Sequence, residues 1–380
     1  MVASRDELDA ELRTITDMRN ALAGELPPER EEQLLAEAMD YLQRTTPRQT
    51  TWQDIAAGQM AHVDQTWAEM EQWIAGDVPT GVQGNPLRAL EQTKDRYEQS
   101  VLRVGETLGE QADRIAEERI AQLGPNPVPE LRDRCRDAAR AYIASDVTNR
   151  EEAMRRLREA RDALNEVDGH QVLSREATIR AQAYREVLSQ IRPMGGVQPA
   201  IKGRPRAEAV EHLSTVSNDV PAEWIAAINA TQPPLSLSRI KGVRANYRPG
   251  EHKIVVAAHG HVSEMYHEFG HRLEEHVPAV WLATNTFLQR RTTDADGNRE
   301  PERRYGPGRS DEHIRPDGFV EGYVGKSYDG VYTEVFSTGM EALFAGRYGG
   351  LVGDRGADRK DLEHRNLILG LLASAKVRTR

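Results

Sequence analysis

Two histidines four residues apart, with a glutamate directly after the first, constrain this chain more than any other feature. They are His267, Glu268 and His271, within the segment HVSEMYHEFGHRLEEHVP at residues 261–278. Residues four apart on a helix project on the same side, so both imidazoles can reach one metal ion. The alternative is an ordinary amphipathic helix whose histidines bind no metal.

The surroundings of this motif predict a helix. Apolar residues recur at steps of four (Met265, Phe269 and Leu273), Ser263 is a plausible N-cap, and Pro278 marks the end. Gly270 leaves one side of the helix bare, so we expect another backbone to pack close to it.

The pattern H-E-x-x-H has a defined chemistry in metallopeptidases. The two histidines bind zinc, and the glutamate between them accepts a proton from an activated water. Zinc lowers the pKa of that water toward about 7. We therefore predict His267 and His271 as ligands of Zn²⁺ and Glu268 as the general base, which then carries the proton to the leaving amine.

A catalytic zinc ion takes three protein ligands and leaves the fourth position to water. Glu274 and His276 lie farther along the same helix and would converge poorly on the ion. Position 274 is also not the glycine of the longer motif H-E-x-x-H-x-x-G-x-x-H. We predict Glu334 instead, which completes a His₂Glu ligand set.

Glu334 opens a separate predicted helix, TEVFSTGMEALFAG, with Thr333 as its cap and Gly346 as its stop. A rival group of candidate ligands, Asp311, Glu312 and His313, lies in an expected loop. On the predicted helix Thr338 and Glu341 share the face of Glu334, and either could hydrogen-bond a ligand histidine. Glu341 is the stronger choice because a carboxylate orients an imidazole N–H well; the alternative is an exposed glutamate.

Peptide hydrolysis also requires a donor to the developing oxyanion. Three tyrosines precede Glu334 closely, namely Tyr323, Tyr328 and Tyr332. We predict Tyr328 for this role because it lies in the turn KSYDG, from which it could overhang a cleft. An ordinary half-buried tyrosine is the alternative for each of the three.

The pattern of the whole chain predicts an α+β protein of two domains. Residues 1–200 read as helices, and a segment rich in Pro and Gly at 191–206 reads as a linker to a second domain at 201–380. In that domain VRANY and KIVVA (243–257) predict a β-hairpin, and residues 290–330 predict a long loop. The helices expected outside the motif region cover 8–22, 52–74, 87–123, 129–166, 174–192 and 361–375.

Composition narrows the function. A net charge of −10 argues against a nucleic-acid-binding role for the whole protein. The single cysteine, Cys135, excludes an intramolecular disulfide and a cysteine zinc cluster. The N-terminus has no secretory pattern and the apolar run at 367–375 is too short to span a bilayer. We expect no membrane association and a cytoplasmic protein, with virion association or export by a signal-less route as alternatives.

The motif and the downstream glutamate resemble the gluzincin branch of the zincin metallopeptidases. The stretch TEVFS, after a tyrosine-containing segment, is similar to the ligand helix of the anthrax lethal factor catalytic domain. The longer run YHEFGHRLE … YVGKSYDGVYTEVFSTGMEALF looks like metallopeptidase-like domains of phage, prophage and bacterial toxin-like proteins. The resemblance covers roughly residues 240–375. One departure is that the second acidic residue, Glu341, follows Glu334 by seven residues and not by four.

The resemblance implies a zincin-like domain in which a small sheet lies over the ligand helix. An edge strand would border the cleft and bind an extended peptide by strand addition, and KIVVA is the expected edge. We therefore expect a zinc-dependent endopeptidase whose helical domain binds a partner, delivers the enzyme or covers the cleft. The alternatives are a structural or interaction protein with a vestigial metal site, and a zinc hydrolase that does not act on peptides.

Overall fold

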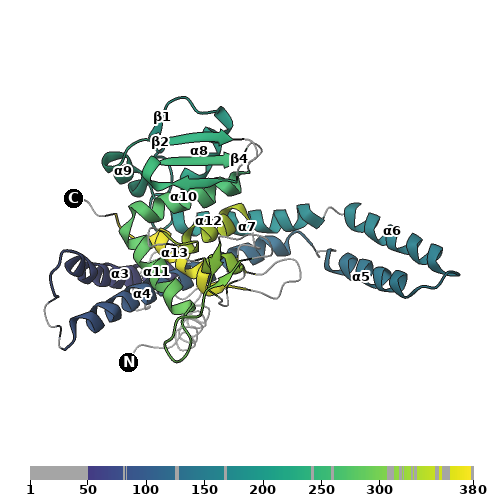
Figure 1. Cartoon of the computed structure of the whole chain (residues 1–380), viewed down its shortest axis with the longest axis horizontal. Coiled ribbons are helices and arrows are strands. Elements are labelled where there is room, and N and C mark those ends of the chain that lie inside the picture. The colour runs from purple at the N-terminus through teal and green to yellow at the C-terminus, as the bar shows by residue number, and fades with distance from the viewer. Residues whose placement is uncertain are drawn as a thin grey trace, which may run out of the picture. The chain divides into compact units, whose positions relative to one another are not determined.

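In the computed structural model the chain divides into two units, Met1–Thr51 and Trp52–Arg380. The structure describes residues 50–79, 82, 84–124, 128–166, 169–240, 244–257, 261–305, 312–315, 319, 321–326, 328, 332–346, 351–352 and 360–377. The helix predicted at 8–22 lies outside these residues. The second unit, drawn in colour in Figure 1, combines many helices with a small sheet, so the α+β prediction is confirmed.

Helices account for the first part of the second unit. They are α3 (Trp52–Ile74), α4 (Pro86–Ala121), α5 (Val128–Ala144), α6 (Arg150–Glu166) and α7 (Gly169–Ser189). The single helix predicted over 129–166 is wrong, because the chain turns between α5 and α6. There the carboxylate of Asp146 accepts hydrogen bonds from the backbone N–H groups of Thr148 and Asn149, at 3.0 and 3.2 Å. Such local bonds compete with helix continuation.

The sheet has four strands in the order β1-β2-β4-β3. They are β1 (Ile201–Lys202), β2 (Leu235–Ile240), β3 (Asn246–Arg248) and β4 (Lys253–Ala257). The predicted hairpin is confirmed, since β3 and β4 pair antiparallel on either side of the short helix η1 (Pro249–Glu251). The predicted linker at 191–206 contributes strand β1.

The prediction of KIVVA as the edge strand is wrong. KIVVA is β4, which pairs with β2 on one side and β3 on the other. Its three central residues are buried in succession, as expected of an interior strand covered on both faces. The edge next to it is therefore β3.

The remaining helices are α8 (Ala207–Ser217), α9 (Ala222–Thr231), α10 (Val262–His276), α11 (Pro278–Arg291), α12 (Val335–Ala345) and α13 (Leu362–Ser374). The motif helix α10 begins one residue before Ser263, so His261 and not Ser263 is its N-cap. Pro278 follows the end of α10 and also starts α11, where its missing N–H costs nothing. The segment predicted as loop at 290–330 holds β5 (Arg303–Arg304), β6 (His313–Ile314) and η2 (Gly322–Gly325).

One hydrophobic cluster runs through the second unit, from α3 and α4 to α12 and α13. Figure 1 shows α10 between the sheet and α12, and α10 contacts both. Helices before residue 200 and elements after it thus contribute to the same cluster, and the domain division at 200 stays a prediction. Helix α12 is buried from Val335 to Phe344, which makes it a central helix rather than an amphipathic one.

The apolar run at 367–375 belongs to α13, whose residues from Leu367 to Ser374 are all buried. Backbone contact with α4 explains this burial. A Cβ on Gly370 would lie 2.0 Å from the carbonyl oxygen of Val101, and one on Gly105 would lie 1.6 Å from that of Asn366. Within the described part of the chain, no helix combines the length and the apolar character needed to cross a bilayer.

We expect Gly370→Ala to destabilise the second unit, because the added methyl would force α4 and α13 apart. Overpacking of this kind costs about 1–3 kcal/mol, measurable by urea unfolding. Gly58→Ala in α3 is the matched control. Nothing lies within 4 Å of a Cβ at that position, so the better helix propensity of alanine should leave stability unchanged or raise it by up to about 1 kcal/mol. Equal stability of the two variants would contradict this account.

Candidate metal centre

The position of the candidate site depends on how closely α10 and α12 pack. A Cβ on Gly270 would lie 2.7 Å from the Cα of Ser337, closer than a real Cβ can approach. The expectation that Gly270 admits another backbone is confirmed, and that backbone is α12. The contact brings the start of α12 next to the motif histidines.

The Nε2 atoms of His267 and His271 converge on one carboxylate oxygen, Oε2 of Glu334. The distances are 3.0 Å from His267 and 3.4 Å from His271. Each of the three residues offers one ligand atom, and these atoms lie within 4.8 Å of one another. Glu334 is completely buried, whereas 14% of the His267 side chain stays exposed. The structure therefore brings the three predicted ligands together at a point that solvent can reach.

This arrangement fits a metal ion. Tetrahedral zinc with bonds of about 2.0–2.1 Å holds its ligand atoms about 3.4 Å apart. The observed separations of 3.0 and 3.4 Å are close to that value. Two imidazole nitrogens and one carboxylate oxygen also match the donor set of zinc sites that keep one position open.

Glu334 is the N-cap residue of α12, so the prediction of Thr333 in that place is wrong by one residue. Thr333 still serves the helix start, because its hydroxyl accepts the N–H of Val335 at 3.1 Å. Gly346 ends the helix in the left-handed region, with φ of 71°, as predicted. The ligand carboxylate therefore comes from a rigid helix end.

The Glu334 carboxylate is held ionised by its neighbours. Burial alone would raise its pKa, but His271 and His267 outweigh burial and hold the pKa well below its usual value. The Tyr328 hydroxyl donates to Oε1, and the Ser337 hydroxyl donates to Oε2 at 3.2 Å. Glu334 is thus a charged and oriented candidate ligand.

The neighbours of His267 favour its protonated form in the metal-free protein. Burial opposes protonation, but Glu334 and Glu341 raise the pKa of His267 to about 10. A metal binds the neutral imidazole, so we expect metal binding to displace this proton.

Glu341 lies beside the other ring nitrogen of His267. Its Oε2 is 3.4 Å from Nδ1, the position from which a carboxylate orients a ligand imidazole. Thr338, the other candidate for this role, is buried, and its hydroxyl has no hydrogen-bond partner among the described residues. The geometry thus favours Glu341 over Thr338, and the role itself stays a prediction.

Glu268 is buried, with 6% of its surface exposed. Burial raises the pKa of its carboxyl, and the two motif histidines and the backbone N–H of Tyr247 only partly offset that effect. A carboxylate with a raised pKa is a better proton acceptor near neutral pH. The site thus holds an acid–base group next to the three candidate ligands.

The three tyrosines considered as oxyanion donors have different surroundings. The Tyr323 hydroxyl accepts hydrogen bonds from Arg244 and Lys326, at 2.8 and 2.9 Å. The Tyr332 ring lies 4.4 Å from the His271 ring, between centroids. Tyr328 is the one whose hydroxyl bonds a candidate ligand, Glu334. Burial and then Glu334 raise the pKa of Tyr328, so it remains a neutral donor.

The structure describes two of the three rival ligands, and neither joins the candidate ligands. Glu312 accepts from Arg244 at 2.8 Å and from Lys326 at 3.2 Å, so its charge is already paired. His313 is exposed on β6, and Asp311 lies outside the described residues. Among the described residues, neither Glu312 nor His313 belongs to the group that could hold a metal.

Glu274 is a further functional candidate, although its position on the motif helix predicts only a poor metal ligand. It is fully buried on α10, and Thr284 of α11 donates to its carboxylate. Thr333 donates to it twice, from the hydroxyl at 2.8 Å and from the backbone N–H at 2.9 Å. Because Thr333 directly precedes Glu334, Glu274 fixes the chain at the third candidate ligand. Its position on the same helix face as His267 indicated that it lies near the site. Its hydrogen bonds to threonine could not be predicted, because Thr333 is distant in the sequence.

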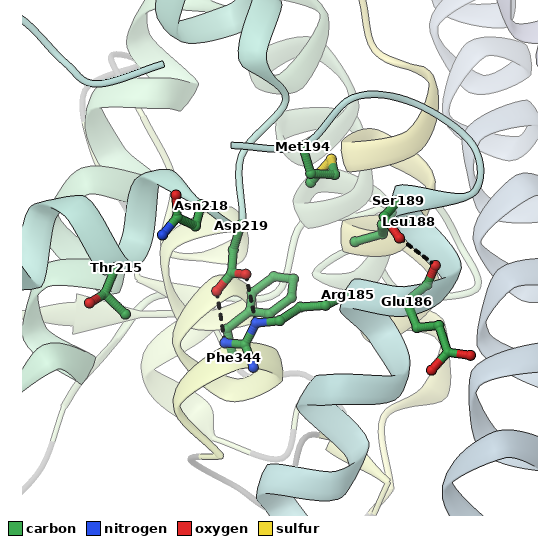
Figure 2. A pocket seen from close by; sticks show the side chains of 9 residues that line it. All are labelled: Arg185, Glu186, Leu188, Ser189, Met194, Thr215, Asn218, Asp219 and Phe344. Carbon is green, nitrogen blue, oxygen red and sulfur yellow. Dashed lines mark hydrogen bonds and ion pairs between the residues drawn. The ribbon is translucent and has the colours of Figure 1, made fainter. Parts of the chain in front are cut away.

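A second polar network connects α7 to the motif helix, and Figure 2 shows its main ion pair. Arg185 donates to both carboxylate oxygens of Asp219, at 2.7 and 2.8 Å. The hydroxyl of Tyr266, the residue before His267, donates to the same carboxylate. The pair lines a largely apolar cavity of about 710 Å³ that also includes Phe344. We assign this network a structural role, since it ties a helix of the first 200 residues to the motif helix.

Comparisons with protein-family models, with curated proteins and with solved structures found no match to this chain. The function must therefore be argued from the site itself.

Glu274→Gln should change how stability depends on pH. Burial raises the pKa of Glu274 to about 7 in the folded protein, from about 4.5 for a free carboxyl. Between these values the folded state keeps a proton that the unfolded state has released, so this group lowers stability as pH rises. Glutamine stays neutral throughout. The stability of the metal-free protein relative to the variant should therefore fall from pH 5 to pH 8, measured by urea unfolding.

The control for this experiment is Glu251→Gln, which changes a glutamate whose side chain is 54% exposed. Its stability difference from the parent should be nearly independent of pH. A pH-independent difference for Glu274→Gln as well would contradict a buried, proton-retaining carboxyl.

We expect the purified chain to bind one zinc ion, measured by competition with a chromophoric chelator. His271→Ala and Glu334→Ala should each weaken binding by more than about 100-fold, and Glu341→Gln by about 10–100-fold. His62→Ala, which removes an exposed histidine on α3, is the control and should bind like the parent. Unchanged affinity in His271→Ala would rule out the site.

Proposed function

We propose that this chain is a zinc-dependent endopeptidase with a zincin-like catalytic domain of the gluzincin type. The observation that carries the proposal is the convergence of His267 Nε2, His271 Nε2 and a Glu334 carboxylate oxygen. The buried carboxyl of Glu268 lies on α10, the helix that carries both histidines. A binding site alone would need the three ligands, whereas hydrolysis also needs the base.

His267, His271 and Glu334 would hold the ion, which as a Lewis acid supplies polarisation of a peptide carbonyl and acidification of water. The roles of the protein groups follow from their positions. Glu268 takes a proton from the attacking water and delivers it to the nitrogen of the leaving amine. Tyr328 donates its single O–H to Glu334 in the metal-free protein, and would turn it to the carbonyl oxygen as negative charge develops there.

The edge strand β3 supports a peptide as substrate. The backbone N–H of Tyr247 in β3 faces the Glu268 carboxylate, so this edge points at the proposed base. Of the described strands, only β4 pairs with β3. An extended peptide that added to the free side of β3 would therefore run past Glu268.

The central test is Glu268→Gln, which keeps the size of the side chain and removes the base. We expect hydrolysis of a diverse peptide pool to fall by about 10²–10⁴-fold while one zinc ion stays bound, measured by mass spectrometry and metal analysis. Glu264→Gln, one turn earlier on α10 and partly exposed, is the matched control and should retain activity.

Two outcomes would redirect the proposal. Parental activity in Glu268→Gln would remove this residue as the base. A parent chain that binds zinc but cleaves no peptide would favour the alternatives, a structural metal site or a hydrolase of other substrates, which a screen of ester and amide substrates would separate.

A further inference from the structure

A cavity of about 310 Å³ lies beside the candidate metal centre. Tyr328 and Tyr332 line it, and both also contact candidate ligands. Tyr328 donates to Glu334, and the Tyr332 ring lies 4.4 Å from that of His271. The cavity and the metal centre therefore share a wall, and a group bound in the cavity would lie next to the reacting bond.

The described lining of this cavity is cationic. It includes Arg299, Arg315 and Lys326, and no acidic residue occurs among the described residues that line it. The chain as a whole carries a net charge of −10, so the local charge of this lining is opposite in sign to the net charge of the chain. A concave surface of one charge sign concentrates ligands of the opposite sign.

Two of the three cations have acidic partners outside the lining. Arg315 pairs with Glu302 at 2.8 Å, and Lys326 pairs with Glu312 at 3.2 Å. Arg299 makes no ion pair with any residue that the structure describes. Burial and the nearby Arg315 lower the pKa of Arg299, as expected for two guanidinium groups close together. Arg299 is thus the lining cation that has no ion-pair partner among the described residues, and Glu302, which pairs with Arg315, offsets its charge only in part.

The other lining groups suit one planar, charged side chain. Asn285 and Gln289 of α11 contribute amides, and Trp281, one turn before Asn285, contributes an aromatic surface. The volume matches a single amino-acid side chain with its water better than a large ligand. The fork of an arginine guanidinium pairs with a carboxylate through two parallel hydrogen bonds.

We propose that this cavity is a specificity pocket that binds a carboxylate of the peptide substrate, selected by the charge of Arg299. The inference rests on the proposed peptidase function and names its substrate class, peptides with an acidic group near the cleaved bond. That carboxylate belongs either to an aspartate or glutamate side chain or to the C-terminus of the peptide, and the test separates these sources.

The test uses the zinc-loaded full chain and two sets of fluorogenic peptides. The first set consists of peptide pairs with an amidated C-terminus. The two members of a pair carry Glu or Gln at one position near the cleaved bond, and the pairs cover these positions in turn. In the second set the C-terminus is free or amidated. For the parent we expect kcat/KM to favour one carboxylate peptide over its neutral partner by roughly tenfold or more. A position-specific Glu preference identifies a side-chain carboxylate, and a preference for the free terminus identifies the C-terminal one.

Arg299→Gln should reduce that ratio to near one, and Arg299→Glu should reverse it in favour of the neutral peptide. Arg299 is exposed, so neither change should disturb folding. The matched control is Arg303→Gln, an exposed arginine on β5 outside the lining, which should keep the parental ratio. Cleavage without any preference for a carboxylate would overturn the pocket and leave the peptidase proposal intact.

A binding measurement covers the case in which no peptide is cleaved, which would count against the peptidase proposal. Fluorescence anisotropy of the same labelled peptides with zinc-loaded Glu268→Gln should show tighter binding of the carboxylate peptide. The preference should disappear in the double variant with Arg299→Gln. Equal binding of carboxylate and neutral peptides would overturn the pocket independently of catalysis.

Discussion

The contact between α10 and α12 is the constraint on which the rest of the site depends. Gly270 has no side chain, so the backbone of α10 can approach that of α12 closely at Ser337. A larger residue at 270 would move α12 outward, and Glu334 would move with it. The ligand geometry of 3.0 and 3.4 Å is thus a consequence of helix packing, because ligands on rigid elements keep their positions only if the elements do.

Three buried carboxylates near this contact have different neighbours and therefore different favoured charge states. Glu334 faces two imidazoles and stays charged. Glu274 faces neutral threonine donors, and its pKa rises to about 7. Glu268 is buried beside the histidines, and its pKa is raised, which suits a proton acceptor. The same residue type thus suits the proposed ligand, a positioning group and the proposed base, because the neighbours of each carboxylate decide which charge state is favoured.

The helices before residue 200 are part of the scaffold that supports the site. Helix α4 packs backbone to backbone with α13 through Gly105 and Gly370. Helix α7 reaches the motif helix through Arg185, Asp219 and Tyr266. In contrast, α5 and α6 pair with each other and bury none of their described side chains. The described first part of the second unit therefore combines a helical base for the site with a solvated hairpin.

The sequence alone determined the motif helix, the separate helix next to Glu334, the β3–β4 hairpin and the three residues that converge. Each of these depends on local periodicity, capping or spacing, which a linear sequence records directly. It did not determine the strand order, so KIVVA was expected at the edge that β3 occupies. Nor could it show that Glu274 bonds Thr333 or that Arg299 shares a cavity with Tyr328. These contacts depend on which distant elements pack together, and only the tertiary structure decides that packing. Burial and charge pairing arise between segments that are far apart in the sequence, and nothing local in the sequence indicates that they will meet.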